Sequence, residues 1–372
     1  MPNQRLLARF DIIVSMKILA APLIATEKAD AQYYLCRNLA DLFVQSGHTC
    51  MISASRANGF RKASLYPSVP LKKPLFTEAG HSYEEWLYAA GAGSERWLSS
   101  DVDNLLETAD ATHPDLIISM DRIGAVIAAR LRNIPCISFV SSAVFRTSSL
   151  PPKILRGTNQ VLSAYHLEQE FSLADFYRRF GRLFAFGTAE LQSFPSDLSV
   201  ERIGMPHILP VRTARTNRVV IFLGSCGKRA SFLCQIIREA FLGAPYAVYA
   251  WYPGVRPEKD ANLHFIENPR PDLIAGAFAC IHDGNPYLFQ NAIAQGVQQL
   301  IITDHSYPRI YTAQTAQRSG CGLYLYEEEL SMSSLYETYR RLVSDDVHEN
   351  HTLRLKDDLV SLGDLTELLN RI

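Results

Sequence analysis

Two turns in the second half of the chain carry residue types that bind anions. In "GSCGKRAS", Gly224 and Gly227 allow close approach of the backbone, while Ser225 and Lys228 offer donors where a helix is expected to begin. Helix N-termini present unbonded N–H groups and the positive end of the helix dipole, which suits a phosphate. The stretch is neither a Walker A loop nor a GxGxxG turn, so a plain strand-to-helix connection remains the alternative.

The second turn is "HDGNP" (282–286), which follows the apolar run 277–281 and opens a helical stretch ending near Gly296. A histidine directly after a strand is more often structural than functional. His282, however, is expected at the same sheet edge as the first turn, and two such turns at one edge favour a ligand site.

The elements that must position these turns follow from hydrophobic patterning. Short apolar runs alternate with helical patterns such as 29–47 and 122–133, and this order predicts right-handed βαβ units in parallel sheets. The predicted fold is α/β, with two doubly wound Rossmann-like domains facing a cleft, and ligands outside the carboxyl ends of the strands. The expected strands are 17–23, 48–53, 115–120, 135–140 and 182–187, and then 218–225, 246–251, 263–266, 277–281, 298–303 and 322–326.

The same patterning divides the chain. We expect an N-terminal extension at 1–15, one domain at 16–205, and a second domain at 206–372 that includes two closing helices. The Pro- and Arg-marked stretch 202–217 is the expected linker. The first residues mimic a signal peptide, but Asp11 and Lys17 interrupt the apolar run that such a peptide needs.

Composition excludes several classes of protein. The net charge of −1 argues against a nucleic-acid binder, which normally has a basic excess. Seven scattered cysteines, never in a CxxC pair, are typical of reduced core residues in a cytoplasmic protein. No stretch approaches the roughly 20 apolar residues that span a bilayer.

Several motifs together resemble the GT-B glycosyltransferases, in particular the nucleotide-sugar-dependent branch that includes plant, macrolide and other natural-product enzymes. The chain opens its first domain with "MKILAAPLIATEKADAQYYLCRNLADLFVQSGH" and continues with "HPDLIISMDRIGAVIAARLRNIPCISF". The second domain begins with "VVIFLGS" and has the family's donor-side outline over 262–322. The resemblance covers most of residues 16–345 and is weakest around 55–110 and 145–180.

The resemblance implies a function. It implies transfer of a sugar from a nucleotide-diphosphate sugar, commonly UDP-glucose, to a small-molecule or lipidic acceptor. The reaction would be inverting and independent of metal, and the nucleotide sugar would be a co-substrate, with no further cofactor. A homo- or hetero-oligomer is compatible with the same resemblance.

The acceptor side departs from the family at its base. The family uses a histidine to remove the proton of the acceptor hydroxyl, and the matching position here is Gln32, whose amide cannot take a proton. Asp30 lies two residues away, and Asp121 matches the acid that normally pairs with the histidine. The catalytic candidates implied by the resemblance are therefore Asp30, Gln32 and Asp121.

The donor side departs as well, and two registers are open. One places Asp283 at the family's phosphate-binding histidine and Asn291 at its ribose-binding glutamate; the other places His282 and Gln290 there. Pro286 removes an N–H donor from the turn. The implied donor-site candidates are Gly224, Ser225, Lys228, Pro269, Arg270, His282, Asp283, Gly284, Asn285, Gln290, Asn291, Asp304 and Arg309.

Charge is the central problem of this donor site. A carboxylate at Asp283 would repel a diphosphate unless Lys228, Arg270 or Arg309 compensates. Arg309 falls, with Pro308, where the family has its sugar-binding Asp–Gln pair, and Arg270 replaces the glutamine of the family's "PQ".

Three functional hypotheses stay open at this stage. The first is a sugar transferase using a carboxylate base. The second is a catalytically inactive glycosyltransferase-like partner or regulatory protein, and the third is another nucleotide-sugar enzyme, such as a hydrolase or epimerase. Two other patterns are assigned structural roles: Trp86 and Trp97 are expected in the core, and the acids of "YEEEL" (326–330) need only the start of a helix.

Overall fold

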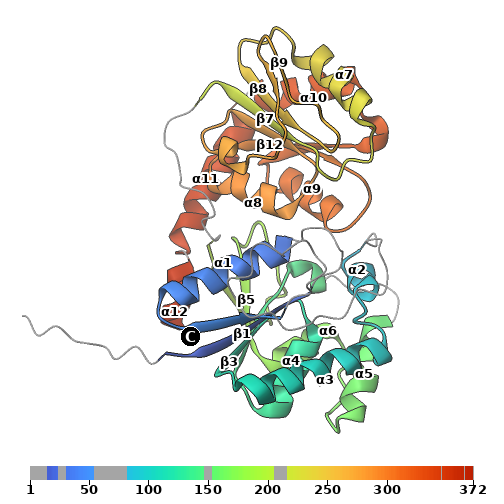
Figure 1. The fold of residues 1–372 in the computed structure, drawn as a ribbon, viewed down its shortest axis with the longest axis vertical. Helices are drawn as coiled ribbons and strands as arrows, with labels where there is room; N and C mark the ends of the chain where they lie inside the picture. Colours follow the sequence, from blue (N-terminus) through green and yellow to red (C-terminus); the bar gives the residue numbers. More distant parts are fainter. Residues whose placement is uncertain are drawn as a thin grey trace, which may run out of the picture.

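The fold is described from a computed structural model, which describes residues 15–23, 31–53, 82–145, 153–204, 216–344, 346–363 and 365–371. Two α/β lobes are stacked along the long axis of the molecule, with the N-terminal lobe below the C-terminal one in Figure 1. Each lobe contains one twisted sheet flanked by helices, so the predicted pair of doubly wound domains is confirmed.

The N-terminal sheet has six strands in the order β2-β1-β3-β4-β5-β6, and every neighbouring pair is parallel. Its central strands are buried on both faces, as parallel sheets require, because helices cover them. The prediction missed β6, whose last residues fall inside the expected linker. The strands are β1 (Lys17–Pro22), β2 (Thr49–Ile52), β3 (Leu116–Met120), β4 (Cys136–Phe139), β5 (Arg182–Phe186) and β6 (Val200–Ile203).

The helices of this domain begin at polar caps and bury one face. The side chain of Ser94 accepts the N–H of Trp97, and Trp86 and Trp97 are both buried, so the assignment of these tryptophans to the core is confirmed. The helices are α1 (Ala31–Gln45), α2 (Tyr83–Ala89), α3 (Glu95–Thr112), α4 (Ile123–Arg132), the 3-10 turn η2 (Ser142–Phe145), α5 (Lys153–Ala164) and α6 (Leu173–Phe180).

The C-terminal sheet has seven strands in the order β13-β12-β11-β7-β8-β10-β9, and only the short edge strand β9, which the sequence did not predict, is antiparallel. The strands are β7 (Arg218–Phe222), β8 (Ala247–Trp251), β9 (Glu258–Asp260), β10 (Leu263–Phe265), β11 (Ala279–His282), β12 (Gln298–Thr303) and β13 (Gly322–Tyr326). The helices are α7 (Ala230–Phe241), η3 (Pro271–Ile274), α8 (Pro286–Ala294), α9 (Arg309–Arg318), η4 (Glu327–Glu329), α10 (Met332–Val343), α11 (Val347–Ser361) and α12 (Leu365–Arg371).

The end of the chain returns to the N-terminal domain. Helices α11 and α12, red in Figure 1, run down the side of the molecule to the lower lobe. The N–H of Gly204 donates to the carbonyl of Gly363 at 3.1 Å, and a Cβ on Gly204 would lie 2.2 Å from that oxygen. Leu359 and Leu368 join the same buried cluster as Phe186, so apolar burial holds the crossing helices in place.

A buried ion pair behind the β3 edge leads to a stability prediction. The guanidinium of Arg122 donates to both carboxylate oxygens of Asp101 at 2.6 and 3.1 Å and to the hydroxyl of Ser53 at 2.7 Å, and both side chains of the pair are at most 2% exposed. Arg122→Met is expected to lower the free energy of unfolding by about 3–5 kcal/mol, because it leaves the Asp101 carboxylate buried without its partner.

Urea unfolding followed by tryptophan fluorescence measures this effect. The matched control is Arg132→Met, which breaks the exposed pair with Asp110 and should leave the midpoint almost unchanged. Equal midpoints for the two variants would contradict the prediction.

All seven cysteines are free thiols, five of them buried and two half-buried, in agreement with the prediction of reduced core residues. Within the described ranges, none of the helices combines the length and the apolar character that crossing a bilayer demands.

Candidate active site

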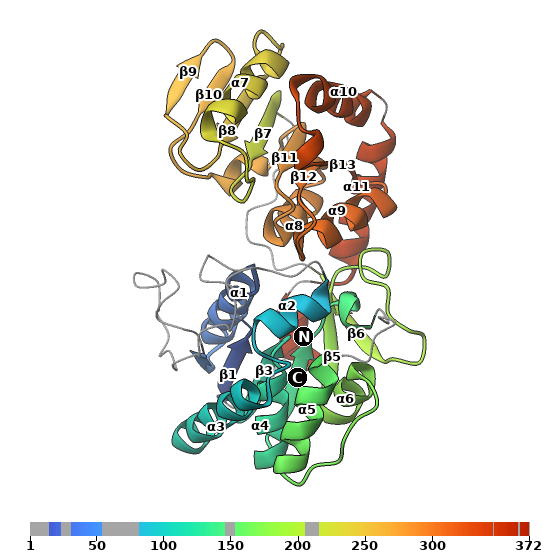
Figure 2. The same cartoon turned by 90° about the vertical axis from the view of Figure 1, so that its right-hand side faces the viewer.

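In Figure 2, α2 of the N-terminal lobe lies on the side that faces α8 and α9 of the C-terminal lobe. The ring of Tyr307, after β12, lies 5.5 Å from that of Tyr83 and 5.8 Å from that of Trp86, centroid to centroid. The hydroxyls of Tyr311 and Ser142 are 2.5 Å apart. Residues of the C-terminal domain therefore contact the strand-end loops of the N-terminal domain directly.

Of the three catalytic candidates, Asp121 is the one whose side chain the structure describes. Asp30 lies outside the described residues, and so does the side chain of Gln32, although its backbone is in the first turn of α1. Asp121 follows β3 directly, in the left-handed conformation with φ 56°, which aspartate tolerates better than most residues. Its side chain is buried, and it accepts the hydroxyl of Tyr83 at 2.6 Å.

The hydroxyl of Tyr83 is held as a donor to this carboxylate. Burial, together with the negative charge of Asp121, raises the pKa of Tyr83 well above its ordinary value. The phenol therefore keeps its proton at neutral pH and fixes the orientation of the Asp121 carboxylate. Through the contact of Tyr83 with Tyr307, this pair also touches the C-terminal domain.

Two N–H groups of the turn 224–231 are bonded to acidic side chains. The N–H of Ser225 donates to Oδ2 of Asp283 at 2.5 Å, and the N–H of Gly227 donates to Oε2 of Glu327 at 2.9 Å. Burial raises the pKa of the Cys226 thiol between them to about 11, so this cysteine is uncharged at neutral pH.

Backbone N–H groups at the start of α8 also bond to side chains of the protein. The N–H of Asn285 donates to Oδ1 of Asp283 at 3.2 Å, and the Asn285 side chain accepts the N–H of Tyr287 at 2.8 Å. Pro286, the first helical residue, has no N–H to offer. At the start of α8, Pro286 therefore lacks an N–H group, and the N–H groups of Asn285 and Tyr287 are bonded within the protein.

His282, a predicted phosphate ligand, has both ring nitrogens engaged within the protein. Its side chain is completely buried, Nδ1 accepts the N–H of Gly284 at 3.2 Å, and Nε2 lies 2.8 Å from the side-chain oxygen of Gln299. The strand β11 ends at His282, one residue later than the predicted run 277–281. His282 is therefore part of the sheet, and its ring is buried. Burial lowers the pKa of His282, so the neutral ring is favoured.

Arg309 is the cation that connects the donor-side segments. It donates to the carbonyls of Asp283 at 2.5 Å and Ser225 at 3.3 Å, and forms ion pairs with Glu327 at 2.6 Å and Asp304 at 2.7 Å. Its side chain is only 10% exposed. Arg309 therefore lies at the Asp283 turn, with its charge paired to Glu327 and Asp304.

Arg270 does not compensate the charge of Asp283. Its exposed guanidinium pairs with its neighbour Asp272 at 2.7 Å, just after Pro269 and at the start of η3. Lys228 is half-buried beside the first turn, and no ion pair joins it to another described residue. Of the three cations considered, Arg309 is the one bonded to the Asp283 turn.

The two candidates for ribose binding differ in their surroundings. The amide of Asn291 donates to the carbonyl of Tyr287 within α8 at 2.9 Å, so it serves the helix. The side-chain oxygen of Gln290 is buried, and no described residue donates a hydrogen bond to it. Gln290 is thus better placed than Asn291 to receive a hydroxyl donor.

Glu327 belongs to the site and was missed. The sequence analysis assigned the acids of 326–330 only to a helix start, yet Glu327 is buried against Arg309 and the Gly227 N–H. The available signal was its place directly after β13, on the sheet edge that also carries the Asp283 turn.

The buried histidine leads to a pH prediction. The pKa of His282 in the folded protein is lowered from its ordinary value of 6.5. Below about pH 6.5 the unfolded chain therefore binds a proton at this residue more readily than the folded chain does, and the free energy of unfolding must fall as the pH drops. His282→Asn, whose side-chain oxygen can still accept the Gly284 N–H, should flatten this slope between pH 7 and 5. Urea midpoints measured across that range test it, with exposed His305→Asn as the control; an unchanged slope in His282→Asn would contradict it.

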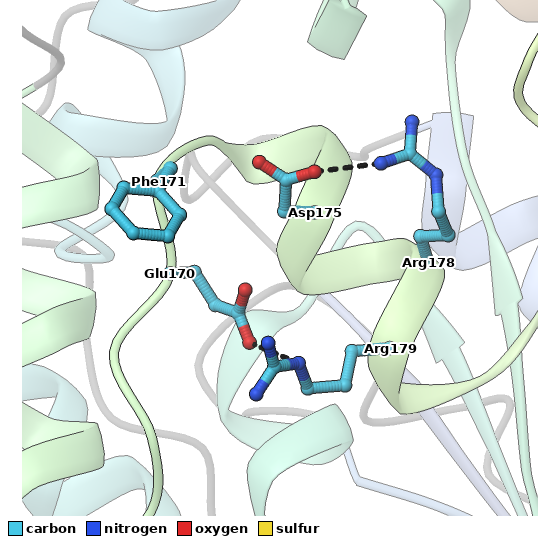
Figure 3. A pocket seen from close by; sticks show the side chains of 5 residues that line it. All are labelled: Glu170, Phe171, Asp175, Arg178 and Arg179. Atoms are coloured by element: carbon cyan, nitrogen blue, oxygen red, sulfur yellow. Dashed lines mark hydrogen bonds and ion pairs between the residues drawn. The ribbon is translucent and has the colours of Figure 1, made fainter.

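A surface pocket of about 280 Å³ lies in the N-terminal domain and is lined by charged residues of α6 and the segment before it (Figure 3). Arg179 pairs with Glu170 and Arg178 pairs with Asp175, while the ring of Phe171 is 92% exposed. Because its guanidinium and carboxylate groups neutralise one another, we assign it no part in the proposed reaction.

Among the described residues, no cluster of histidine, cysteine and acidic side chains is suited to a metal ion.

Comparison with solved structures decides the fold family. The calicheamicin glycosyltransferase CalG4 superposes with a TM-score of 0.72 at 16% identity, over 96% of this chain and 97% of that one. The chain has the GT-B fold. The glycosyltransferase VinC, solved in complex with DTDP, gives a TM-score of 0.66 at 18% identity, and the spinosyn rhamnosyltransferase SpnG, complexed with thymidine diphosphate, gives 0.67 at 13%; each comparison covers 96% of this chain and at least 98% of the other.

Sequence comparison supports the resemblance to glycosyltransferases. Residues 262–372 match the family described as erythromycin biosynthesis protein CIII-like, C-terminal domain. The chain is similar to the aclacinomycin-T 2-deoxy-L-fucose transferase of Streptomyces galilaeus (31% identity over 120 residues, 31% of this chain and 27% of that protein). It is also similar to the 3-alpha-mycarosylerythronolide B desosaminyl transferase of Saccharopolyspora erythraea (30% over 155 residues, 39% and 36%).

The matched segments thus span about a third of the curated relatives. The resemblance to natural-product and macrolide glycosyltransferases that the motifs indicated is confirmed.

Proposed function

We propose that this protein is a glycosyltransferase that moves a deoxysugar from a nucleoside-diphosphate donor to a polyketide-type small-molecule acceptor. The observation that carries the proposal is the family match over 262–372, which includes the whole donor-side edge from β11 to β13 on a GT-B scaffold. Both curated relatives are named as transferases of deoxysugars.

The proposed donor nucleotide is thymidine diphosphate rather than the UDP expected from the wider family. Two related structures hold thymidine diphosphate, which supports this choice. On the protein side, Gln290, whose side-chain oxygen has no hydrogen-bond donor among the described residues, is the proposed partner for the 3′-hydroxyl of the deoxyribose. The turn 224–231 and the start of α8 are the proposed diphosphate site.

In the proposed inverting step, the acceptor hydroxyl oxygen attacks the anomeric carbon while the bond from that carbon to the diphosphate oxygen breaks. Asp121 takes the hydroxyl proton, and Tyr83 holds the carboxylate in position through the 2.6 Å hydrogen bond. The nucleoside diphosphate leaves with the bonding electron pair, and the N–H groups and cations of the donor-side turns stabilise its charge.

Calorimetric titration with dTDP, UDP and GDP, followed by donor consumption with and without a polyketide macrolactone, tests the proposal. We expect micromolar binding of dTDP and donor consumption that requires the acceptor. Consumption without acceptor dependence would instead indicate a hydrolase. A folded protein that binds none of the three nucleotides would defeat the proposal.

One observation favours a second candidate, a glycosyltransferase-like protein that acts through a partner without transferring sugar. The N–H groups of Ser225, Gly227 and Asn285, which would receive a diphosphate, are bonded to Asp283 and Glu327. This candidate predicts no nucleotide binding even when those carboxylates are removed.

A further inference from the structure

Two carboxylates, those of Asp283 and Glu327, accept backbone N–H groups in the two turns that were predicted to bind phosphate. Asp283 accepts the N–H of Ser225 with one oxygen and the N–H of Asn285 with the other, so it bridges the loop after β7 and the start of α8. Glu327 accepts the N–H of Gly227 from the same loop. Bridging a glycine-containing loop and a helix start through backbone N–H groups is what the oxygens of a bound phosphate do.

The arrangement leaves little room beside the carboxylates. Asp283 is 2% exposed, and a Cβ on Gly224 would lie 2.8 Å from the ring of Trp251 and 3.6 Å from Oδ2 of Asp283. Gly284 has φ 80°, and a Cβ there would lie 3.0 Å from the carbonyl oxygen of Arg309. The turn is therefore closed around the Asp283 side chain.

One buried cation lies among these acids and offsets only part of their charge. Arg309 pairs with Glu327 and Asp304 and donates to the carbonyl of Asp283, so the buried acids have a buried cation among them. A phosphate entering the same space would meet N–H groups already in use and an uncompensated like charge.

We propose that Asp283 is a built-in competitor for the phosphate oxygens of the donor. The donor diphosphate binds at this turn only when the Asp283 carboxylate turns away from Ser225 and Asn285, so Asp283 sets the affinity of the site. The proposal rests on the function proposed above, and it concerns a residue that determines donor affinity rather than one that takes part in the chemistry.

The experiment compares wild-type protein with three variants. Asp283→Ala releases both N–H groups, whereas Asp283→Asn keeps one acceptor and loses the charge. Asp260→Asn is the matched control, because it removes an acid from the same domain that pairs with Arg238 on the edge strand β9, away from the loop after β7 and the start of α8. Inorganic pyrophosphate and dTDP are titrated calorimetrically into each protein after circular dichroism has verified its fold.

We expect pyrophosphate and dTDP to bind Asp283→Ala roughly tenfold or more tightly than wild type, since each recovered charge-assisted hydrogen bond is worth about a factor of ten. Asp283→Asn should fall between them, and Asp260→Asn should stay within about threefold of wild type. Pyrophosphate affinities that are equal in wild type, Asp283→Asn and Asp283→Ala would overturn the proposal. If Asp283→Ala fails to fold, Asp283→Asn alone decides.

The two probes separate this inference from the proposed function. A gain in pyrophosphate affinity with no preference for dTDP and no consumption of a dTDP-sugar supports the competitor role and defeats the transferase. Tight dTDP binding and transfer by wild type, with no gain in either variant, supports the transferase and overturns the competitor role.

Discussion

Replacing Asp121 with asparagine is expected to lower the rate of sugar transfer roughly 100- to 10,000-fold, the range over which a general base contributes to enzymatic rates. The amide cannot accept the proton of the attacking hydroxyl. The fold should be preserved, because asparagine tolerates the left-handed backbone at this position and its oxygen can still accept the Tyr83 hydroxyl. Initial rates with a dTDP-sugar and acceptor measure the effect.

The control is an acid at the other end of the same strand. Asp115 precedes β3, is exposed, and accepts the N–H of Lys17 at 2.7 Å, far from the strand-end loops. Asp115→Asn should transfer sugar at the wild-type rate. If Asp121→Asn retains activity within about threefold of wild type, Asp121 is not the base, and Asp30 becomes the carboxylate to replace.

Replacing Arg309 with methionine is expected to lower the free energy of unfolding by about 3–5 kcal/mol, because it removes the buried cation that balances Glu327. Both side chains of this pair are about nine-tenths buried, so solvent screens them weakly. The loss should also free the loop after β7 from the Asp283 turn, since Arg309 donates to a carbonyl in each.

A double-mutant cycle with Glu327→Gln isolates the charge pair. Removing both charges should cost less than the sum of the two single changes, with a coupling on the order of 1–3 kcal/mol. Arg270→Met, which breaks an exposed pair with Asp272, is the control and should leave the urea midpoint nearly unchanged. Additive effects of Arg309→Met and Glu327→Gln would show that the pair contributes no coupling energy.

The sequence by itself determined the scaffold and the location of the site. Apolar runs of strand length alternating with amphipathic helices allow little besides parallel sheets with covered faces, so the two domains and most strands could be predicted. The carboxyl-edge rule then predicts that the turns of Ser225 and His282 lie together. The short edge strands β6 and β9 escaped prediction because three or four half-exposed residues carry too little pattern.

Only the tertiary structure decided which groups fill the donor site. A one-residue difference in where β11 ends turns His282 into the sheet and brings Asp283 to the N–H groups of Ser225 and Asn285. Likewise Glu327, at the start of η4, meets Arg309, at the start of α9, 18 residues away along the chain. Hydrogen bonds between side chains and distant backbone depend on atomic positions set by packing of the whole domain, which local residue patterns do not encode.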